Sequence, residues 1–346
     1  MLAIHATHGC ALLGNGHACT ASLVPHFRRS WQSSTWSQFH LLTCICLQGK
    51  IPTGVWEQMP NLQHLAVRDC SHLTSLSSIT DSLAHLQHLE LRSCTALCLP
   101  EAIGKLPQLR HLSLRDCTAL ESLEAISSLS WLQHIDLSGC KALQHLPESI
   151  HQLQGLKHLK LAGCSSLQAL PDMSGQVHHL LSLSLRGCSA MKRLPMSLLQ
   201  LKQLQYLDIS EWTSTSCFPG SELQMVSLTR LDLAHSKSLV SLPESLWDLG
   251  GLQYLNFCGC SSLQHLSDSV SRLTKLQHLN LSKCSSLQSL PQDTDKLCSL
   301  TYMVLDHCAQ LDTLPDSFGH LTQLEHLSIG HCSSLEHLLH QPGTEA

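Results

Sequence analysis

The sequence predicts an α/β solenoid, a curved rod in which about a dozen copies of one short unit stack their strands into a parallel sheet. A pattern of leucines returns every 23 or 24 residues from Leu62 to Leu324. The first half of each unit alternates inward and outward side chains as a strand does. The second half is too short for a long helix. A phase that is held over this many copies indicates a repeat architecture.

The unit reads L-x-x-L-x-L-x-x-C-x-x-L-x-x-L-P-x-x-I-x-x-L, and its clearest copy runs from Leu132 to Leu153. This spacing is that of a leucine-rich repeat. Its fourth and sixth positions point into the core, and its third, fifth and seventh positions point outward. Segments such as LPESIHQL are expected to form 3₁₀ turns, short helical turns or irregular structure on the convex side. The leading leucines are Leu62, Leu86, Leu109, Leu132, Leu156, Leu180, Leu204, Leu228, Leu252, Leu276, Leu300 and Leu324.

The repeat divides the chain into three parts. Residues 1–41 do not fit the unit and are expected to form a poorly ordered leader. Residues 42–340 form the leucine-rich-repeat domain, with one degenerate unit followed by about twelve regular ones. Residues 341–346 are a tail. Two units depart from the pattern, one around residues 94–100 and one in which EWTSTSCFPGSEL replaces the second half after residue 210. Such breaks either serve a function or reflect drift in one copy.

Composition excludes several classes of function. Charged residues make up 14% of the chain and the net charge is −5, which argues against a nucleic-acid partner. The sequence contains no run of 18 or more apolar residues, so we expect no membrane-spanning helix. The first residues lack the basic region of a signal peptide. We therefore expect a cytoplasmic protein, with the nucleus as the alternative location, and no membrane partner.

Cysteine is unusually frequent, with 18 residues, and the repeat explains ten of them. They occupy the ninth position of the unit, where the chain turns after the strand. Reduced, buried thiols suit that place and a reducing compartment, and a disulfide or metal ladder is the alternative. Trp212 and Ser236 hold this position in two units. The ten ninth-position cysteines are Cys70, Cys94, Cys117, Cys140, Cys164, Cys188, Cys260, Cys284, Cys308 and Cys332.

The outward strand positions carry a histidine row beside an arginine row in the first half of the repeat. The row has three interpretations: tolerated duplication on a solvated face, a protein-binding surface whose charge changes near pH 6–7, or a metal ladder. Tyr206, Arg230 and Tyr254 should be neighbours across three strands, and Tyr and Arg are favoured at protein interfaces. The candidate partner-binding residues are His64, Arg68, His88, Arg92, His111, Arg115, His134, His158, Tyr206, Asp208, Arg230, Asp232, Tyr254 and Tyr302.

No motif indicates an enzyme. The sequence contains no G-x-x-x-x-G-K-[ST], no G-x-S-x-G and no H-E-x-x-H. No pair of carboxylates stands out from those of the neighbouring units as a candidate general acid and general base. We therefore expect no catalytic residues, no cofactor and no bound metal.

Four segments carry a resemblance to a known family: GCSSLQALP at 163–171, GCSAMKRLP at 187–195, GCSSLQHL at 259–266 and KCSSLQSLP at 283–291. They resemble the leucine-rich-repeat region of plant disease-resistance receptors of the TIR and nucleotide-binding class. The Leu-Pro half-repeat also resembles Ras-interacting leucine-rich-repeat scaffolds. The resemblance covers about residues 42–340 and includes no TIR or nucleotide-binding module.

This resemblance implies a non-enzymatic module that recognises a protein partner, either a pathogen effector or a host protein, through its concave face. It implies no nucleotide switch. The chain is expected to be part of a larger receptor or associated with one. The alternatives are a substrate adaptor of a ubiquitin ligase, since cysteine-bearing repeats also follow F-box motifs, and a Ras-type signalling scaffold.

Overall fold

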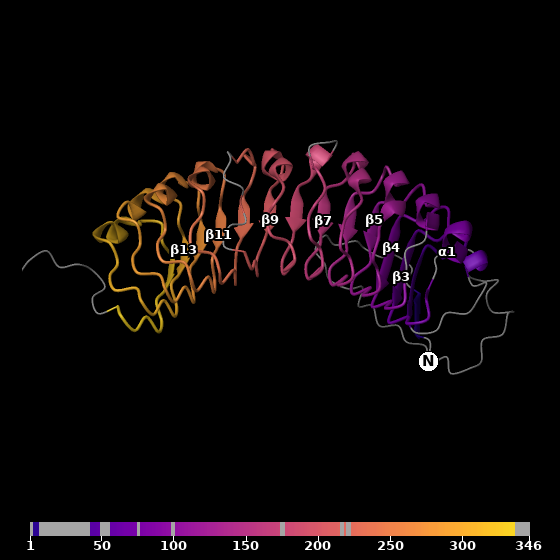
Figure 1. The fold of residues 1–346 in the computed structure, drawn as a ribbon, viewed down its shortest axis with the longest axis horizontal. Coiled ribbons are helices and arrows are strands. Elements are labelled where there is room, and N and C mark those ends of the chain that lie inside the picture. The colour runs from indigo at the N-terminus through magenta and orange to yellow at the C-terminus, as the bar shows by residue number, and fades with distance from the viewer. Residues whose placement is uncertain are drawn as a thin grey trace, which may run out of the picture.

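A computed structural model shows one continuous curved rod (Figure 1). The leader expected at 1–41 lies outside the described residues except for 3–6, as does the tail at 341–346. Parts of both irregular units also fall outside them. The structure describes residues 3–6, 42–48, 56–74, 77–97, 101–173, 177–214, 218 and 223–335.

The described strands form one fourteen-stranded sheet in which spatial order follows chain order. All neighbouring strands pair in parallel except the first two, which are antiparallel. The predicted solenoid with a parallel sheet is thus confirmed. The strands are β1 (Ala3–Ala6), β2 (Cys44–Gln48), β3 (His64–Arg68), β4 (His88–Arg92), β5 (His111–Ser113), β6 (His134–Asp136), β7 (His158–Lys160), β8 (Ser182–Ser184), β9 (Tyr206–Asp208), β10 (Arg230–Asp232), β11 (Tyr254–Asn256), β12 (His278–Asn280), β13 (Tyr302–Val304) and β14 (His326–Ser328).

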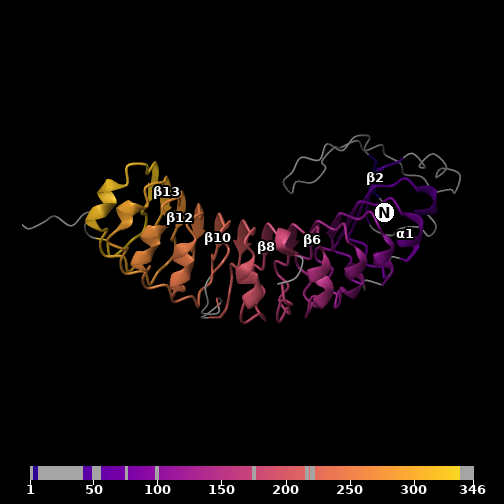
Figure 2. The ribbon, with the colours of Figure 1, turned by 90° about the horizontal axis from the view of Figure 1, so that it is seen from above.

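Short helices follow the outer rim of the arch, and the strands lie toward its inner side (Figures 1 and 2). Most are 3₁₀ helices, as the short second half of the unit predicts, and one is a single α-helix of six residues. They are η2 (Trp56–Gln58), α1 (Ser77–Ser82), η3 (Glu101–Lys105), η4 (Glu124–Ser128), η5 (Glu148–Gln152), η6 (Val177–His179), η7 (Met196–Gln200), η8 (Glu244–Asp248), η9 (Asp268–Arg272), η10 (Thr294–Lys296) and η11 (Asp316–His320).

The core is a stack of leucines that runs along the rod. In the unit from Leu132, the side chains of Leu132, Ile135, Leu137 and Leu143 are at most 1% exposed. The same positions are buried in the neighbouring units, so each unit covers the apolar face of the next. Stability therefore comes from contacts between neighbours along the rod.

A left-handed residue follows each strand from β3 to β14 and turns the chain toward the ninth position. Gly139 and Gly163 have φ values of 79° and 74°, and Asp116 has 57° at the equivalent place. Glycine adopts this conformation without the steric cost that a side chain imposes. The amide of Gly139 donates to the carbonyl of Ala162 in the following unit at 2.8 Å, so the turn also joins two units.

The ninth-position cysteines are thiols rather than disulfides and, apart from the partly exposed Cys332, are buried, as the sequence predicts. Their thiols bridge adjacent units. Sγ of Cys164 donates to the carbonyl of Leu137 at 3.1 Å, and the pattern recurs along the rod. Ser236 makes the same bond through its hydroxyl, to Ile209 at 3.4 Å. The recurring spacing shows that the ninth position supplies a second donor to a carbonyl of the preceding unit that also accepts from a backbone amide.

Strand β1 is a feature that the repeat pattern does not predict. It falls in the stretch expected to be a leader, and it pairs antiparallel with β2 from Ala3↔Gln48 to Ala6↔Ile45. Strand β2 is the first of the parallel series, so β1 covers its outer edge and satisfies its backbone groups.

Candidate binding surface on the inner face

The third position of every unit lines up across the sheet as one column, which we call the third-position column. Its members are aligned by the strand register, from Cys44 opposite His64 to Tyr302 opposite His326. It holds mostly flat, ring-bearing side chains, all projecting on the inner face. In chain order the column consists of Cys44, His64, His88, His111, His134, His158, Ser182, Tyr206, Arg230, Tyr254, His278, Tyr302 and His326.

The five histidines of the first half stack face to face. Their ring centroids lie 4.0–4.4 Å apart, and neighbouring planes are inclined by only 14–18°. This separation is less than the ~4.8 Å between neighbouring strands, because the inner side of a curved sheet is compressed. All five rings are half-buried. The histidine row is therefore a packed element rather than a set of independent surface groups.

Burial disfavours the charged form of all five imidazoles. Burial, followed by the neighbouring histidines, lowers the pKa of His88 and of His134 to about 3. Burial also lowers the pKa of His64, His111 and His158. A surface whose charge changes near pH 6–7 was one interpretation of the row, and it is wrong for His88 and His134, whose pKa values lie well below that range. A charged ring here would lose hydration and repel its neighbours.

The second half of the column holds an aromatic and guanidinium cluster, formed by Tyr206, Arg230 and Tyr254. The three residues lie side by side on β9, β10 and β11, as the sequence predicts. The Arg230 guanidinium carbon lies 4.5 Å from the centre of the Tyr254 ring, a cation–π arrangement. Burial, with Asp208 and Asp232 adding to it, raises the pKa of Tyr206 to about 12. The phenol is therefore neutral and can donate a hydrogen bond.

Rings continue beyond this cluster. The Tyr254 and His278 centroids lie 6.1 Å apart, and those of His278 and Tyr302 lie 5.5 Å apart, with tilted planes. Tyr302 then stacks on His326 at 4.3 Å. Tyr302 is exposed and is accessible from the inner face, in keeping with its place among the candidate residues.

The fifth-position carboxylates serve the turn rather than the surface. Asp208 is only 7% exposed. It accepts hydrogen bonds from the backbone and hydroxyl of Ser210 and from the hydroxyl of Ser184. Asp232 accepts from the Ala234 amide and the Asn256 side chain. The structure thus removes Asp208 from the accessible surface, because its lone pairs are used within the fold.

Ion pairs neutralise part of the arginine row. Arg68 contacts Glu90 at 3.2 Å, and Arg92 contacts Asp116 at 3.7 Å. Arg115, two residues after the end of β5, is exposed. Exposed pairs of this kind add little stability, but they leave the first half of the inner face mixed in charge rather than strongly basic.

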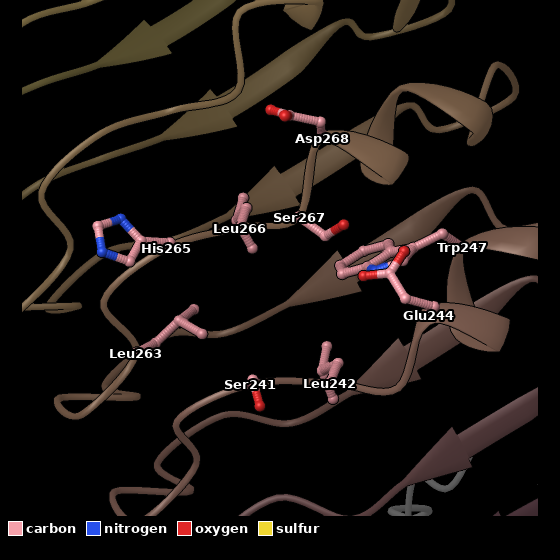
Figure 3. A pocket seen from close by; sticks show the side chains of 9 residues that line it. All are labelled: Ser241, Leu242, Glu244, Trp247, Leu263, His265, Leu266, Ser267 and Asp268. Carbon is pink, nitrogen blue, oxygen red and sulfur yellow. The ribbon is translucent and has the colours of Figure 1, made fainter. Parts of the chain in front are cut away.

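A hollow of about 400 Å³ lies away from the inner face, between the second halves of two neighbouring units. Figure 3 shows Glu244 and Trp247 of η8 opposite His265, Ser267 and Asp268 of the next unit. None of its lining residues belongs to the third-position column. The hollow is therefore separate from the surface that the sequence singles out.

The described residues can also be searched for metal-binding clusters and for membrane-spanning helices. Among them, no three His, Cys, Asp or Glu side chains converge as metal ligands would. The stacked imidazoles are parallel and do not point at one centre. Within the same ranges, no helix has the length and apolar character needed to cross a bilayer.

Comparison with known proteins places the fold. No protein-family model matches the chain, and no curated protein matches it. Among solved structures, the leucine-rich-repeat domain of the type III effector XopL is 28% identical, with 59% of this chain and 71% of that one covered and a TM-score of 0.53. A leucine-rich-repeat protein of Leptospira interrogans is 24% identical, with 86% and 87% covered and a TM-score of 0.51.

The glycosylated Toll–Spätzle complex of Drosophila contains a further similar chain, 21% identical, with 81% of this chain and 38% of that one covered and a TM-score of 0.62. An internalin, InlF of Listeria monocytogenes, is 17% identical, with 84% and 88% covered and a TM-score of 0.57. These likenesses concern the fold. They agree with the strand order and the repeat, and the chain is a leucine-rich-repeat solenoid.

Proposed function

We propose that this chain is a non-enzymatic protein-recognition module that senses its partner through the concave face, as plant disease-resistance receptors do. The observation that carries the proposal is the cluster of Tyr206, Arg230 and Tyr254. Arginine and tyrosine are the residues most often found at binding hot spots. Here the cation–π contact holds Arg230 in place before any partner arrives, which lowers the entropic cost of binding.

The structural neighbours support a protein partner. The Toll structure is a complex with the protein Spätzle, and its fold resembles this chain. A TLR13 structure of similar fold, 18% identical with a TM-score of 0.54, is a complex with single-stranded RNA. A phosphate backbone needs a strongly basic face, whereas this chain has a net charge of −5 and ion-paired arginines. We therefore favour a pathogen effector or a host protein, met in the cytoplasm.

Loss of the cluster should abolish partner capture. The test is crosslinking and mass spectrometry on extract of the source organism, with the parent chain and the triple variant Y206A/R230A/Y254A. We expect a protein whose recovery falls at least roughly tenfold in the triple variant, since two or three hot-spot side chains are removed. Circular dichroism should show unchanged folding, because the substitutions leave the leucine core intact.

The matched control is M196A/R272A, which removes an exposed apolar side chain and an arginine from the outer helices η7 and η9. Recovery should be unchanged in this variant. Equal recovery by the parent and the triple variant would show that the inner-face cluster is not the contact surface. Turnover of a captured small molecule would contradict a non-enzymatic role.

A further inference from the structure

The third-position column is interrupted at one rung in its middle. Strand register places Ser182 between His158 and Tyr206. Every other rung from His64 to His326 carries a ring or a guanidinium. Within the described chain, no ring contact joins His158 to Tyr206, whereas the histidines on the preceding rungs all stack. Figure 2 shows β8, the strand of this rung, near the centre of the rod.

Between His158 and Tyr206 the column lacks one ring, and we call this place the Ser182 gap. Stacked rings of the same column take 4.0–4.4 Å per rung. His158 and Tyr206 are two rungs apart, so their rings are separated by roughly twice that distance. One flat ring inserted over Ser182 would therefore lie at stacking distance from both neighbours. The width of the gap matches the thickness of one aromatic side chain.

The surroundings of the gap are small and partly apolar. Leu181 precedes Ser182, is half-buried, and replaces the polar second-position residues of the flanking units, Lys157 and Gln205. The amides of Leu181 and Ser182 both donate to the Lys157 carbonyl, at 2.8 and 3.1 Å. These backbone amides are thus already hydrogen-bonded and need no acceptor from a ligand.

Below the rung, Ser184 is buried, and its hydroxyl donates to Asp208 at 2.8 Å. This bond occupies the Ser184 hydroxyl, so the Ser182 hydroxyl is the side-chain polar group of this strand that remains at the gap. A ring there would meet the ring faces of His158 and Tyr206.

The charged side chains around the gap affect which flat group of a partner it would accept. Lys157 and Lys160 are exposed on the β7 side, and both act on His158 closely enough to lower its pKa after burial. On the β9 side, Asp208 is buried and bonded within the fold. The guanidinium of Arg186 is paired with Glu211 at 2.8 Å. The two exposed lysines thus make the β7 edge of the gap positive, whereas Asp208 and Asp232 act as negative charges on Tyr206 at the β9 edge. The β7 edge disfavours an inserted arginine and favours acidic residues beside the ring on that side.

We propose that the Ser182 gap is a binding slot for one aromatic side chain of a protein partner, presented by an acidic segment. The proposal rests on the proposed function and deepens it by naming the chemistry of the contact. The ring would complete the column between His158 and Tyr206, and the acidic neighbours would face Lys157 and Lys160.

The first test asks whether the gap holds a ring. Ser182→Phe places a phenyl group there from the chain itself, and Ser182→Ala keeps the gap open as the matched control. We expect the Phe variant to melt no lower than the Ala variant, because the ring stacks on both neighbours. A clearly lower melting temperature for the Phe variant, or failure to fold, would overturn the proposal, since the space would then not accept a ring.

The second test uses labelled peptides and fluorescence polarisation. The probe is a peptide of glutamates around one central tryptophan, and its relatives carry alanine or arginine at the centre. We expect the tryptophan peptide to bind the parent and Ser182→Ala alike, and at least tenfold more weakly to Ser182→Phe. The alanine and arginine peptides should bind the parent at least tenfold more weakly than the tryptophan peptide.

Two outcomes overturn the slot: equal affinity of the tryptophan peptide for the parent and Ser182→Phe, or no advantage of tryptophan over alanine. Neither affects the proposed function, which stands if capture of a partner depends on Tyr206, Arg230 and Tyr254. Capture that is lost in Y206A but unchanged in R230A/Y254A, with the tryptophan peptide still sensitive to Ser182→Phe, would instead move the contact surface to the slot alone.

Discussion

At the scale of single residues, the ninth position decides how each unit is tied to the one before it. A thiol is small enough to be buried in the turn, and it still donates to a carbonyl about 27 positions earlier, as Cys188 does to Leu161. A serine can make the same bond, as Ser236 shows. The Trp212 side chain does not make this bond, and its backbone amide donates to the Ser236 hydroxyl of the following unit. The position therefore selects for a small donor.

Removal of one thiol should weaken the fold modestly. Cys164→Ala removes one of two donors to the Leu137 carbonyl, which keeps the Cys140 amide, and a net hydrogen bond contributes about 1 kcal/mol. We expect a loss of about that size in the free energy of unfolding, measured by urea denaturation. Cys164→Ser keeps a donor and should lose less. A serine variant less stable than the alanine variant would show that packing of the sulfur, and not the bond, is what the site requires.

The same burial should protect the thiols from reagents. Burial raises the pKa of Cys164 to about 12, so almost no thiolate forms at pH 8. Cys298 is exposed. After brief treatment of the folded protein with iodoacetamide, mass spectrometry should find Cys298 alkylated and Cys164 intact, and both modified after denaturation. Alkylation of Cys164 at the rate of Cys298 would mean that the units open locally.

The sequence predicts which residues are buried far better than which atoms meet. The repeat phase alone places Cys164 in the core and Tyr206 on the inner face. It gives no reason to remove Asp208 from the surface, because the fifth position is outward in every unit. The oxygens of that carboxylate are occupied because Ser210 and Ser184 carry hydroxyls within hydrogen-bond distance. Such pairings depend on side-chain choices in two separate units.

At the scale of elements, the histidine stack couples stability to pH. Its pKa values are lowered in the folded protein, so the unfolded chain binds protons that the folded chain does not. The stabilising contribution is complete above about pH 6.5, the ordinary value, and is lost as pH falls toward about 3. Nδ1 of His134 is buried without a hydrogen-bond partner, so protonation there would bury an unpaired donor.

Replacement of a central stack member should flatten this pH dependence. Melting temperatures of the parent should fall between pH 7 and pH 5, and the fall should be smaller in His88→Gln. The groups that act on His88 are His111, His64, His134 and Arg110, and all of them remain in that variant. His72→Gln is the control, because His72 is exposed outside the column. An equal fall in the parent and His88→Gln would show that the stack does not titrate in this range.

Alternation along the strand predicts that the histidines share a face, and it does not predict that they stack. Stacking depends on the curvature, which brings the inner-face rungs to 4.0–4.4 Å, and on a shared side-chain conformation. The spacing of the leucines predicts neither the curvature nor the shared side-chain conformation. Strand β1 is a similar case, since four residues outside the repeat carry little periodic signal and pair only because the edge of β2 is available.

At the scale of the whole molecule, the rod is a one-dimensional array in which each unit contacts only its neighbours. The periodicity of the sequence therefore determines nearly all of the architecture, including strand order and the direction of pairing. The same geometry makes the effect of a core substitution depend on its place along the rod. A central unit supports two neighbours, whereas Leu327 on the last described strand is 38% exposed.

Truncation of a central leucine should thus cost far more than truncation of Leu327. Leu207 is fully buried between β8 and β10, and Leu207→Ala should lower the free energy of unfolding by about 2–5 kcal/mol. Leu327→Ala should cost about 1 kcal/mol or less, because less apolar surface is lost from the core. Hydrogen exchange should speed up in the units on both sides of β9 in the first variant and only around β14 in the second. Similar losses for both would mean that the rod unfolds as one unit regardless of position, and nearest-neighbour stacking would not describe its stability.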